Sequence, residues 1–132
     1  MEEISFRSIT NRIDDLILPS FDLVIGIATG GIVPATLIAY KLGLDVRFIQ
    51  LNFRGTDNKP KSEKPRLISE FNMPPNTHSA LIVDDASISG ATLESARKLV
   101  GVDNTKTLVL KGSADYTLFP EVESCVKWPW RM

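Results

Sequence analysis

The sequence predicts an α/β domain in which a parallel β-sheet carries helices on both faces. Two observations predict this fold. Short apolar runs typical of buried strands alternate along the chain with segments of helical periodicity. At 132 residues the chain is also long enough for one substantial core but not for two domains. Strands separated by helices imply right-handed crossovers, and therefore parallel strands covered from both sides.

The first half of the chain is expected to form a helix, a strand and a second helix. Segment 8–18 has the apolar spacing of an amphipathic helix, with Ser8 as its candidate N-cap. The run 21–27 is apolar, as in a buried strand. Segment 32–42 is predicted to be helical, with a proline in its first turn and Gly43 after its end.

The second half is expected to continue the alternation. Its strands are apolar or β-branched runs, and its helix has apolar residues three and four positions apart. In order, the expected elements are a strand over 46–53, a polar loop over 54–65, a short edge strand over 66–69, a strand over 81–84, a helix over 89–100 and a strand over 106–110. Ligands of such sheets bind beyond the carboxyl ends of the strands, so functional residues are expected there.

Composition argues against several functional classes. Fifteen Lys and Arg balance sixteen Asp and Glu, so no overall positive field is available for nucleic acid. Cys125 is the only cysteine, which rules out an intramolecular disulfide and suits a reducing compartment. With His78 as the only histidine, neither a zinc site nor a Cys/His nucleophile pair is expected. The acidic start and the lack of a long apolar run predict a soluble cytoplasmic protein with no membrane partner.

The most informative stretch is the run 81–92, in which two adjacent acids follow an apolar strand. Asp84 and Asp85 can accept hydrogen bonds from the vicinal hydroxyls of a sugar. The Ser/Gly/Thr turn that follows leaves backbone N–H groups and hydroxyls at a helix N-terminus, which favours a phosphate. In the alternative interpretation the acids cap a helix and Gly90 makes a turn, but one cap does not need two acids. The run predicts a ribose-phosphate site.

This run resembles the phosphoribosyl diphosphate (PRPP) motif of type I phosphoribosyltransferases: a hydrophobic strand, two acids, three variable residues and Ser/Thr-Gly-x-Ser/Thr. The chain is nearest to the small purine (xanthine, guanine, hypoxanthine) members. The resemblance implies one domain over 1–132, with a core of about 20–112 and a small hood from the C-terminal tail, to which the N-terminal helix is a candidate addition. The residues it implies for the ribose and 5'-phosphate are Asp84, Asp85, Ala86, Ser87, Ile88, Ser89, Gly90, Ala91 and Thr92.

The resemblance also implies a reaction and its partners. A 5-phosphoribosyl group would pass from PRPP to a nitrogenous base, with release of diphosphate. Mg²⁺ is the implied cofactor, held mainly through diphosphate and sugar hydroxyls. Asp84 and Asp85 are the implied catalytic residues and metal ligands, directly or through water. The expected partners are PRPP, a nucleobase or nucleotide, and further copies of the chain in a dimer or tetramer.

Two adjacent glycines follow the first predicted strand. Such a pair lets the backbone approach a ligand closely, although it is also common in a plain tight turn. The segment is similar to the diphosphate-binding loop of the purine-type enzymes, which implies diphosphate binding by Ala28, Thr29, Gly30 and Gly31 and a cis peptide at Ala28–Thr29. Thr29 stands where a basic residue often precedes the glycines. Either diphosphate affinity is reduced, or a cation comes from elsewhere.

The segment 54–66 holds five Lys and Arg against two Asp and Glu. A solvated loop is one interpretation of this charge run. Its position resembles that of the flexible catalytic loop that closes over PRPP in the family. Such a lid would exclude water from a reaction with oxocarbenium character.

The last third of the chain bears on the acceptor base. Lys111 sits where the small purine enzymes place a lysine that holds an exocyclic oxygen of the purine. The following tail resembles their aromatic hood, and implies that Cys125, Val126 and Trp128 contact the base. Cys125 falls where an aromatic residue usually stacks on the base, so Trp128 is a candidate to take over the stacking. Alternatively, Trp128 and Trp130 bury the tail against the sheet.

Ile88 departs from the motif of the purine enzymes. Those members carry a third acid at this position, which exchanges a proton with the purine ring, and a hydrocarbon cannot do so. Orotate- and uracil-type members manage without that acid. Purine transfer is therefore expected to be slow. The rival interpretation is a PRPP- or nucleotide-binding sensor with the same fold and little or no transfer.

Overall fold

The computed structural model describes residues 1–52, 66–67 and 71–131. The helices are α1 (Phe6–Asp15), α2 (Ile32–Leu42) and α3 (Ala91–Val100). The strands are β1 (Glu2–Glu3), β2 (Leu23–Ala28), β3 (Val46–Asn52), β4 (Arg66–Leu67), β5 (Ser79–Ser87), β6 (Asn104–Gly112), β7 (Tyr116–Thr117) and β8 (Val126–Lys127). The segment expected to form a lid lies outside the described residues except for its last residue, Arg66.

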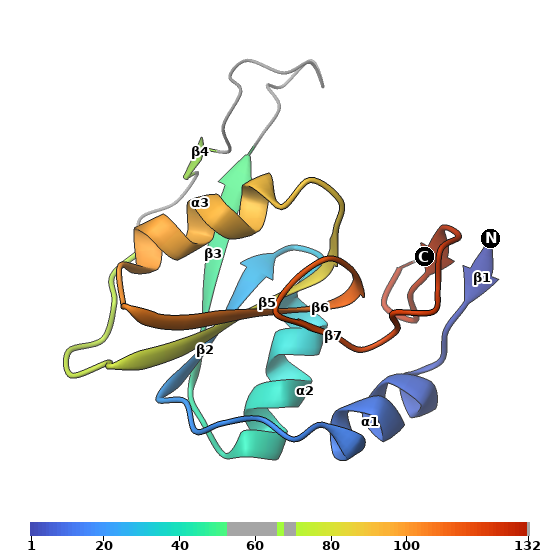
Figure 1. Ribbon diagram of the computed structural model, residues 1–132, viewed down its shortest axis with the longest axis horizontal. Helices are drawn as coiled ribbons and strands as arrows, with labels where there is room; N and C mark the ends of the chain where they lie inside the picture. The colour runs from blue at the N-terminus through green and yellow to red at the C-terminus, as the bar shows by residue number, and fades with distance from the viewer. Residues whose placement is uncertain (53–65, 68–70, 132) are drawn as a thin grey trace.

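In the described part of the chain, six strands form one sheet in the order β4-β3-β2-β5-β6-β7 (Figure 1). All neighbours pair in parallel except β3 and β4, which are antiparallel. Helix α3 covers one face, while α1 and α2 lie on the other. The expected α/β fold with helices on both faces is confirmed.

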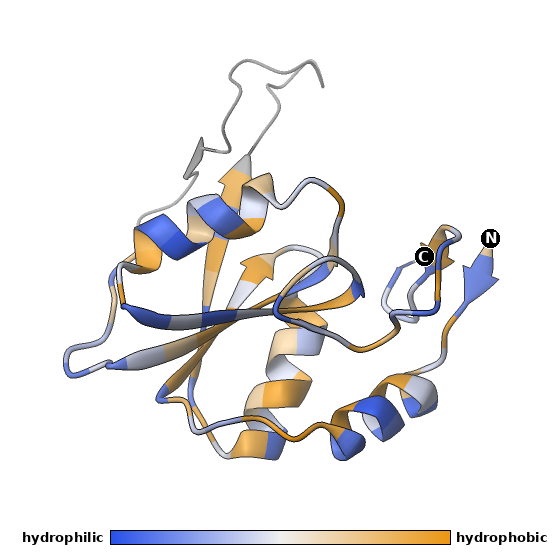
Figure 2. Cartoon of the chain, in the orientation of Figure 1, coloured by the Kyte–Doolittle hydropathy of each residue, from blue (hydrophilic) through white to orange (hydrophobic). Residues whose placement is uncertain are grey.

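The middle residues of the central strands β2, β5 and β6 are apolar, and both of their faces are buried. In β2, Val24 belongs to the core under α1 and α2, whereas Ile25 belongs to the core under α3. Figure 2 shows α2 more hydrophobic than α1 and α3, which carry more hydrophilic residues. The sheet therefore lies between two apolar cores. Packing on both faces fixes the positions of the strand ends, where the site residues lie. Among the described residues, none of the helices has the length and hydrophobicity of a membrane span.

Helix α1 begins earlier and ends earlier than the sequence pattern predicts. Ser5 is the N-cap, because its side chain accepts a hydrogen bond from the backbone N–H of Ser8 at 3.1 Å. Ser8 is thus the capped residue and not the cap. At the other end Leu16 is extended, with ψ 136°. Pro19 disfavours helical backbone at the residue before it, and Leu16 and Leu18 pack on the core from this extended segment.

The other boundaries differ from the predicted ones by a few residues. The strand expected over 21–27 is found at 23–28, that over 46–53 at 46–52, and that over 66–69 at 66–67. The helix expected over 89–100 is found at 91–100. The strands expected over 81–84 and 106–110 are longer and cover 79–87 and 104–112. Strand β5 is longer because β6 continues beside it as far as the pair Ser87–Gly112. Pairing with β2 stops earlier, at Gly26–Val83.

The ends of β2 and β5 form the switch point of the sheet. From β2 the chain crosses through α2 to β3, and from β5 it crosses through α3 to β6 on the opposite side. The two connections diverge, and α/β sheets bind ligands at such a point. Asp84 and Asp85 lie immediately beyond the last pair between these strands.

The tail packs beside the N-terminal segment at one end of the sheet (Figure 1). Strand β1 pairs with β8 in parallel, with Glu2 opposite Val126. Arg12 of α1 reaches the tail as well, since it forms an ion pair with Glu121 at 2.7 Å and lies 4.5 Å from the centre of the Phe119 ring. These contacts join α1 and β1 to the tail.

Candidate active site

Two carboxylates and a glycine loop meet at the switch point. The backbone N–H of Asp85 donates to Asp84 Oδ1 at 2.8 Å, and that of Ala86 donates to Asp85 Oδ1 at 2.8 Å. A Cβ at Gly30 would lie 2.5 Å from Asp85 Oδ2, so a side chain here would displace the Asp85 carboxylate from its present position. The fold therefore holds the loop after β2 directly against the second acid.

The acid pair is electrostatically unbalanced. Burial, followed by the neighbouring Asp85 carboxylate, raises the pKa of Asp84 to about 8. Arg131 opposes this increase, because its Nη2 lies 2.9 Å from Asp85 Oδ2. Within the described residues, Arg131 is thus the cation that faces the two carboxylates. The site can take up a further positive charge, and it would release a proton when it does so.

We expect Asp84→Asn to stabilise the ligand-free protein at alkaline pH and to change little near pH 4. The pKa of Asp84 in the folded protein lies above its ordinary value of 3.8, so the folded protein binds more protons than the unfolded chain at pH values between the two. The free energy of unfolding of the wild type should therefore fall by on the order of 2–4 kcal/mol as pH rises from about 4 to about 8. The Asp84→Asn variant should not show this fall, because asparagine does not ionise.

Urea denaturation of both proteins across this pH range measures the effect. Asp14→Asn is the matched control, because Asp14 is exposed and forms an ion pair with Lys41 on the surface. Parallel stability curves for wild type and Asp84→Asn would show that Asp84 titrates normally.

The turn after β5 leads into α3. Gly90 is the N-cap of α3, and its φ of 81° is a conformation that side-chain-bearing residues rarely adopt. It provides no side-chain cap, although Ser89 Oγ accepts a bond from the Ala91 N–H at 3.3 Å. The helix therefore starts with backbone N–H groups directed at the end of the turn. Ser87 is buried, whereas the Ile88 side chain is 98% exposed.

The loop after β2 has the cis peptide at Ala28–Thr29 that the resemblance implies. Next to it is a cavity of about 320 Å³. Its lining residues are Thr29, Gly30, Ile32, Val33, Trp130 and Arg131. The loop and the tail therefore share one cavity, which the sequence did not predict.

Lys111 connects the end of β6 to the tail. Its Nζ donates to the backbone oxygen of Ser124 at 2.5 Å. Cys125 follows directly and is exposed, and Val126 is half-buried in the pairing of β8 with β1. Lys111 therefore contacts the backbone of the residue that precedes Cys125 and Val126.

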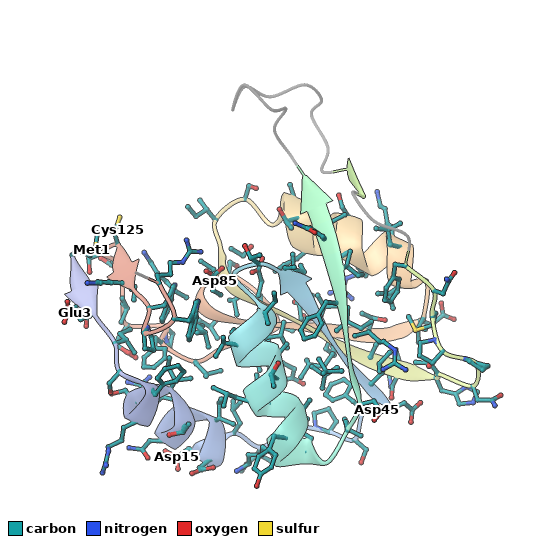
Figure 3. All side chains as sticks on the ribbon, turned by 180° about the vertical axis from the view of Figure 1, so that it is seen from behind. Met1, Glu3, Asp15, Asp45, Asp85 and Cys125 are labelled. Carbon is teal, nitrogen blue, oxygen red and sulfur yellow. The ribbon has the colours of Figure 1, made fainter. Side chains whose placement is uncertain are left out.

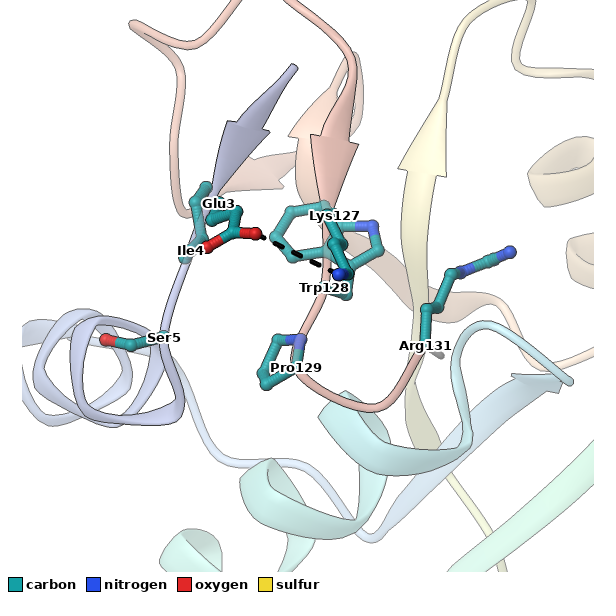
Figure 4. A pocket seen from close by; sticks show the side chains of 7 residues that line it. All are labelled: Glu3, Ile4, Ser5, Lys127, Trp128, Pro129 and Arg131. Atoms are coloured by element: carbon teal, nitrogen blue, oxygen red, sulfur yellow. Dashed lines mark ion pairs between the residues drawn. The ribbon is translucent and has the colours of Figure 1, made fainter.

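Trp128 is buried within an aromatic cluster. Only 4% of the residue is exposed. Its ring stacks on Trp130 at 5.6 Å with an interplanar angle of 6°, and lies 6.4 Å from Phe119. The structure favours burial of the tail over an open stacking surface at Trp128. Trp128 also lines a separate cavity of about 480 Å³ between β1 and the tail, beside the Glu3–Lys127 pair at 3.9 Å (Figure 4).

Arg131 is the site residue that sequence reasoning missed. Figure 4 shows its side chain extending away from Glu3 and Lys127, and its guanidinium reaches Asp85, which Figure 3 places near the N-terminal end of α2. The only signal in the sequence is an arginine directly after the Pro-Trp pair of the tail. Within the described part of the chain, no three His, Cys, Asp or Glu side chains gather as a metal site.

Comparison with known proteins identifies the family. A model of the phosphoribosyl transferase domain matches residues 3–114. The xanthine-guanine phosphoribosyltransferase of Cereibacter sphaeroides is 29% identical over 116 residues, which cover 83% of this chain and 68% of that protein. The orotate phosphoribosyltransferase of Sulfurisphaera tokodaii is 28% identical over 108 residues, which cover 80% of this chain but only 50% of that protein.

Solved structures agree with this assignment. A purine phosphoribosyltransferase from Pyrococcus horikoshii superposes with a TM-score of 0.81 at 25% identity, covering 99% of this chain and 94% of its own. The xanthine-guanine-hypoxanthine phosphoribosyltransferase of Helicobacter pylori has the same fold, with a TM-score of 0.82 at 15% identity, covering 98% of this chain and 93% of its own. Since the family model spans most of the sequence and the expected fold is present, the chain belongs to the phosphoribosyl transferase domain family and is a transferase enzyme.

Proposed function

We propose that this protein transfers the 5-phosphoribosyl group of PRPP to a purine base and releases diphosphate. The observation that carries the proposal is the meeting of Asp84 and Asp85 with the glycine loop at the ends of β2 and β5. Lys111, at the end of β6 beside the tail, supports a purine acceptor, because its ammonium group can donate to an exocyclic oxygen. The xanthine-guanine and purine relatives support the same acceptor class.

In this proposal three segments of the chain at the switch point each bind a different part of PRPP. The 5'-phosphate lies in the turn 87–92, where the first N–H groups of α3 favour an anion. The ribose hydroxyls donate to Asp84 and Asp85, and the diphosphate lies against the backbone of 28–31. Catalysis then consists of positioning the sugar and stabilising the leaving diphosphate.

The acid pair fits Mg²⁺. Two adjacent carboxylates are a suitable oxygen donor set, and the Arg131 side chain that contacts Asp85 is largely exposed and can move aside for the ion. Asp84 and Asp85 would hold the ion directly or through water, together with oxygens of the substrate. When bound, Mg²⁺ would neutralise the charge that develops on diphosphate.

A PRPP- or nucleotide-binding sensor is the second candidate. The observation that favours it is Ile88, whose exposed hydrocarbon side chain occupies the position of the proton-exchanging acid of purine enzymes. Binding of PRPP does not need that acid. The sensor and the enzyme would therefore share the ligand and differ in turnover.

Diphosphate release from PRPP with a panel of bases tests the proposal. Guanine, xanthine and hypoxanthine should each support slow release in the presence of Mg²⁺, whereas orotate and uracil should not. Turnover with orotate alone would reject the purine acceptor. PRPP binding in calorimetry without turnover on any base would make the sensor the better description.

A further inference from the structure

The glycine loop provides no charged side chain for a diphosphate. Ala28, Thr29, Gly30 and Gly31 can offer backbone N–H groups and one hydroxyl. A diphosphate carries several negative charges, and a guanidinium both donates bidentate hydrogen bonds to its oxygens and offsets that charge, which backbone N–H groups cannot do. Among the described residues, six line the cavity beside this loop, and Arg131 is the charged one of these six.

Arg131 is held close to the loop by the structure of the tail. Its backbone N–H donates to the oxygen of Trp128 at 3.0 Å, which closes a turn over Pro129. Trp130, within that turn, stacks on the buried Trp128. The turn is therefore anchored in the core, while the Arg131 side chain remains 57% exposed and free to change partners.

The present partner of Arg131 is also a residue of the site. Its Nη2 contacts Asp85 Oδ2, and the Asp85 carboxylate covers Gly30. In this arrangement the Arg131 guanidinium is paired with the Asp85 carboxylate, which in the proposed function accepts hydrogen bonds from the ribose. The family model ends at residue 114, so Arg131 lies outside the part of the chain that the family match covers.

We propose that Arg131 is the cation of the diphosphate subsite and that it exchanges partners when PRPP binds. The guanidinium leaves Asp85 and donates to oxygens of the diphosphate above Thr29 and Gly30. Asp85 then becomes free to accept from the ribose. The tail thereby couples the diphosphate and ribose subsites. This inference rests on the proposed function, because it assumes PRPP at the switch point.

Calorimetry with three ligands in the presence of Mg²⁺ tests the exchange: PRPP, inorganic diphosphate and ribose 5-phosphate. Arg131→Gln should weaken PRPP and diphosphate by about tenfold or more, since it removes a charge-assisted contact. Affinity for ribose 5-phosphate should be unchanged or several-fold stronger, because Asp85 is released from its ion pair. Arg131→Lys should fall between the wild type and Arg131→Gln for diphosphate, because lysine keeps the charge without the planar fork.

Arg47→Gln is the matched control, because it removes an exposed arginine from β3. It should leave all three affinities unchanged. Equal losses for all three ligands in Arg131→Gln would overturn the exchange, since they indicate a purely structural role. Unchanged diphosphate affinity would overturn it too. A wild-type protein that binds diphosphate but neither PRPP nor ribose 5-phosphate would instead reject the proposed function, and the diphosphate comparison alone would then decide the role of Arg131.

Discussion

Replacing both Asp84 and Asp85 with asparagine is expected to weaken PRPP binding by at least about tenfold, and by much more if both carboxylates accept from the ribose. Hydrogen bonds to a charged acceptor contribute about 1.5–3 kcal/mol each, and asparagine keeps the shape but loses the charge. The substitution also removes donors for Mg²⁺. Calorimetry with PRPP and Mg²⁺ measures the loss.

The fold should survive this double substitution. Asp84→Asn removes a charge that burial disfavours, and Asp85→Asn breaks an ion pair with the largely exposed Arg131. Asp14→Asn again serves as the control for a lost surface carboxylate. Wild-type PRPP affinity in the double variant would contradict the assignment of the acids to the ribose.

Ile88→Asp is expected to raise the rate of purine transfer. A positioned general acid or base typically contributes about 10²–10⁴-fold, and residue 88 follows the acid pair at the spacing where purine enzymes carry this group. The side chain is 98% exposed, so the substitution should change the free energy of unfolding by no more than about 0.5 kcal/mol. Initial rates with guanine, xanthine and hypoxanthine measure the gain.

The matched control is Ile88→Asn, which has the size of aspartate but cannot exchange a proton at neutral pH. A new carboxylate beside the phosphate turn should weaken PRPP binding, so rates are compared at saturating PRPP and affinity is measured separately. If Ile88→Asp folds, binds PRPP and still transfers nothing to any purine, the purine acceptor is rejected. Equal gains in the aspartate and asparagine variants would show that the effect is not proton exchange.

Local sequence determined the elements that surround the candidate site. A buried strand, two acids and a glycine-containing turn stand in one uninterrupted run, so short-range patterns were enough to predict β5, the turn and α3. The loop that contains the two glycines after β2 was predictable for the same reason. The family resemblance rested on these same contiguous segments, and the match of residues 3–114 agrees with it.

Contacts between distant segments were decided only by the tertiary structure. β5 extends to Ser87 because β6 continues beside it, and a strand end depends on its neighbour as much as on its own residues. The burial of Trp128 depends on Phe119 and Trp130 coming together around the tail. No periodicity in the chain encodes either partner.

The ion pair between Arg131 and Asp85 is the clearest example of a contact that the sequence alone could not predict. The two residues are 46 positions apart and meet only because the tail turns over a tryptophan anchored in the core. The sequence showed that the loop lacks a cation, since that is a property of four adjacent residues. Which arginine of the chain lies within reach depends on packing across the whole sheet, and only the folded structure determined it.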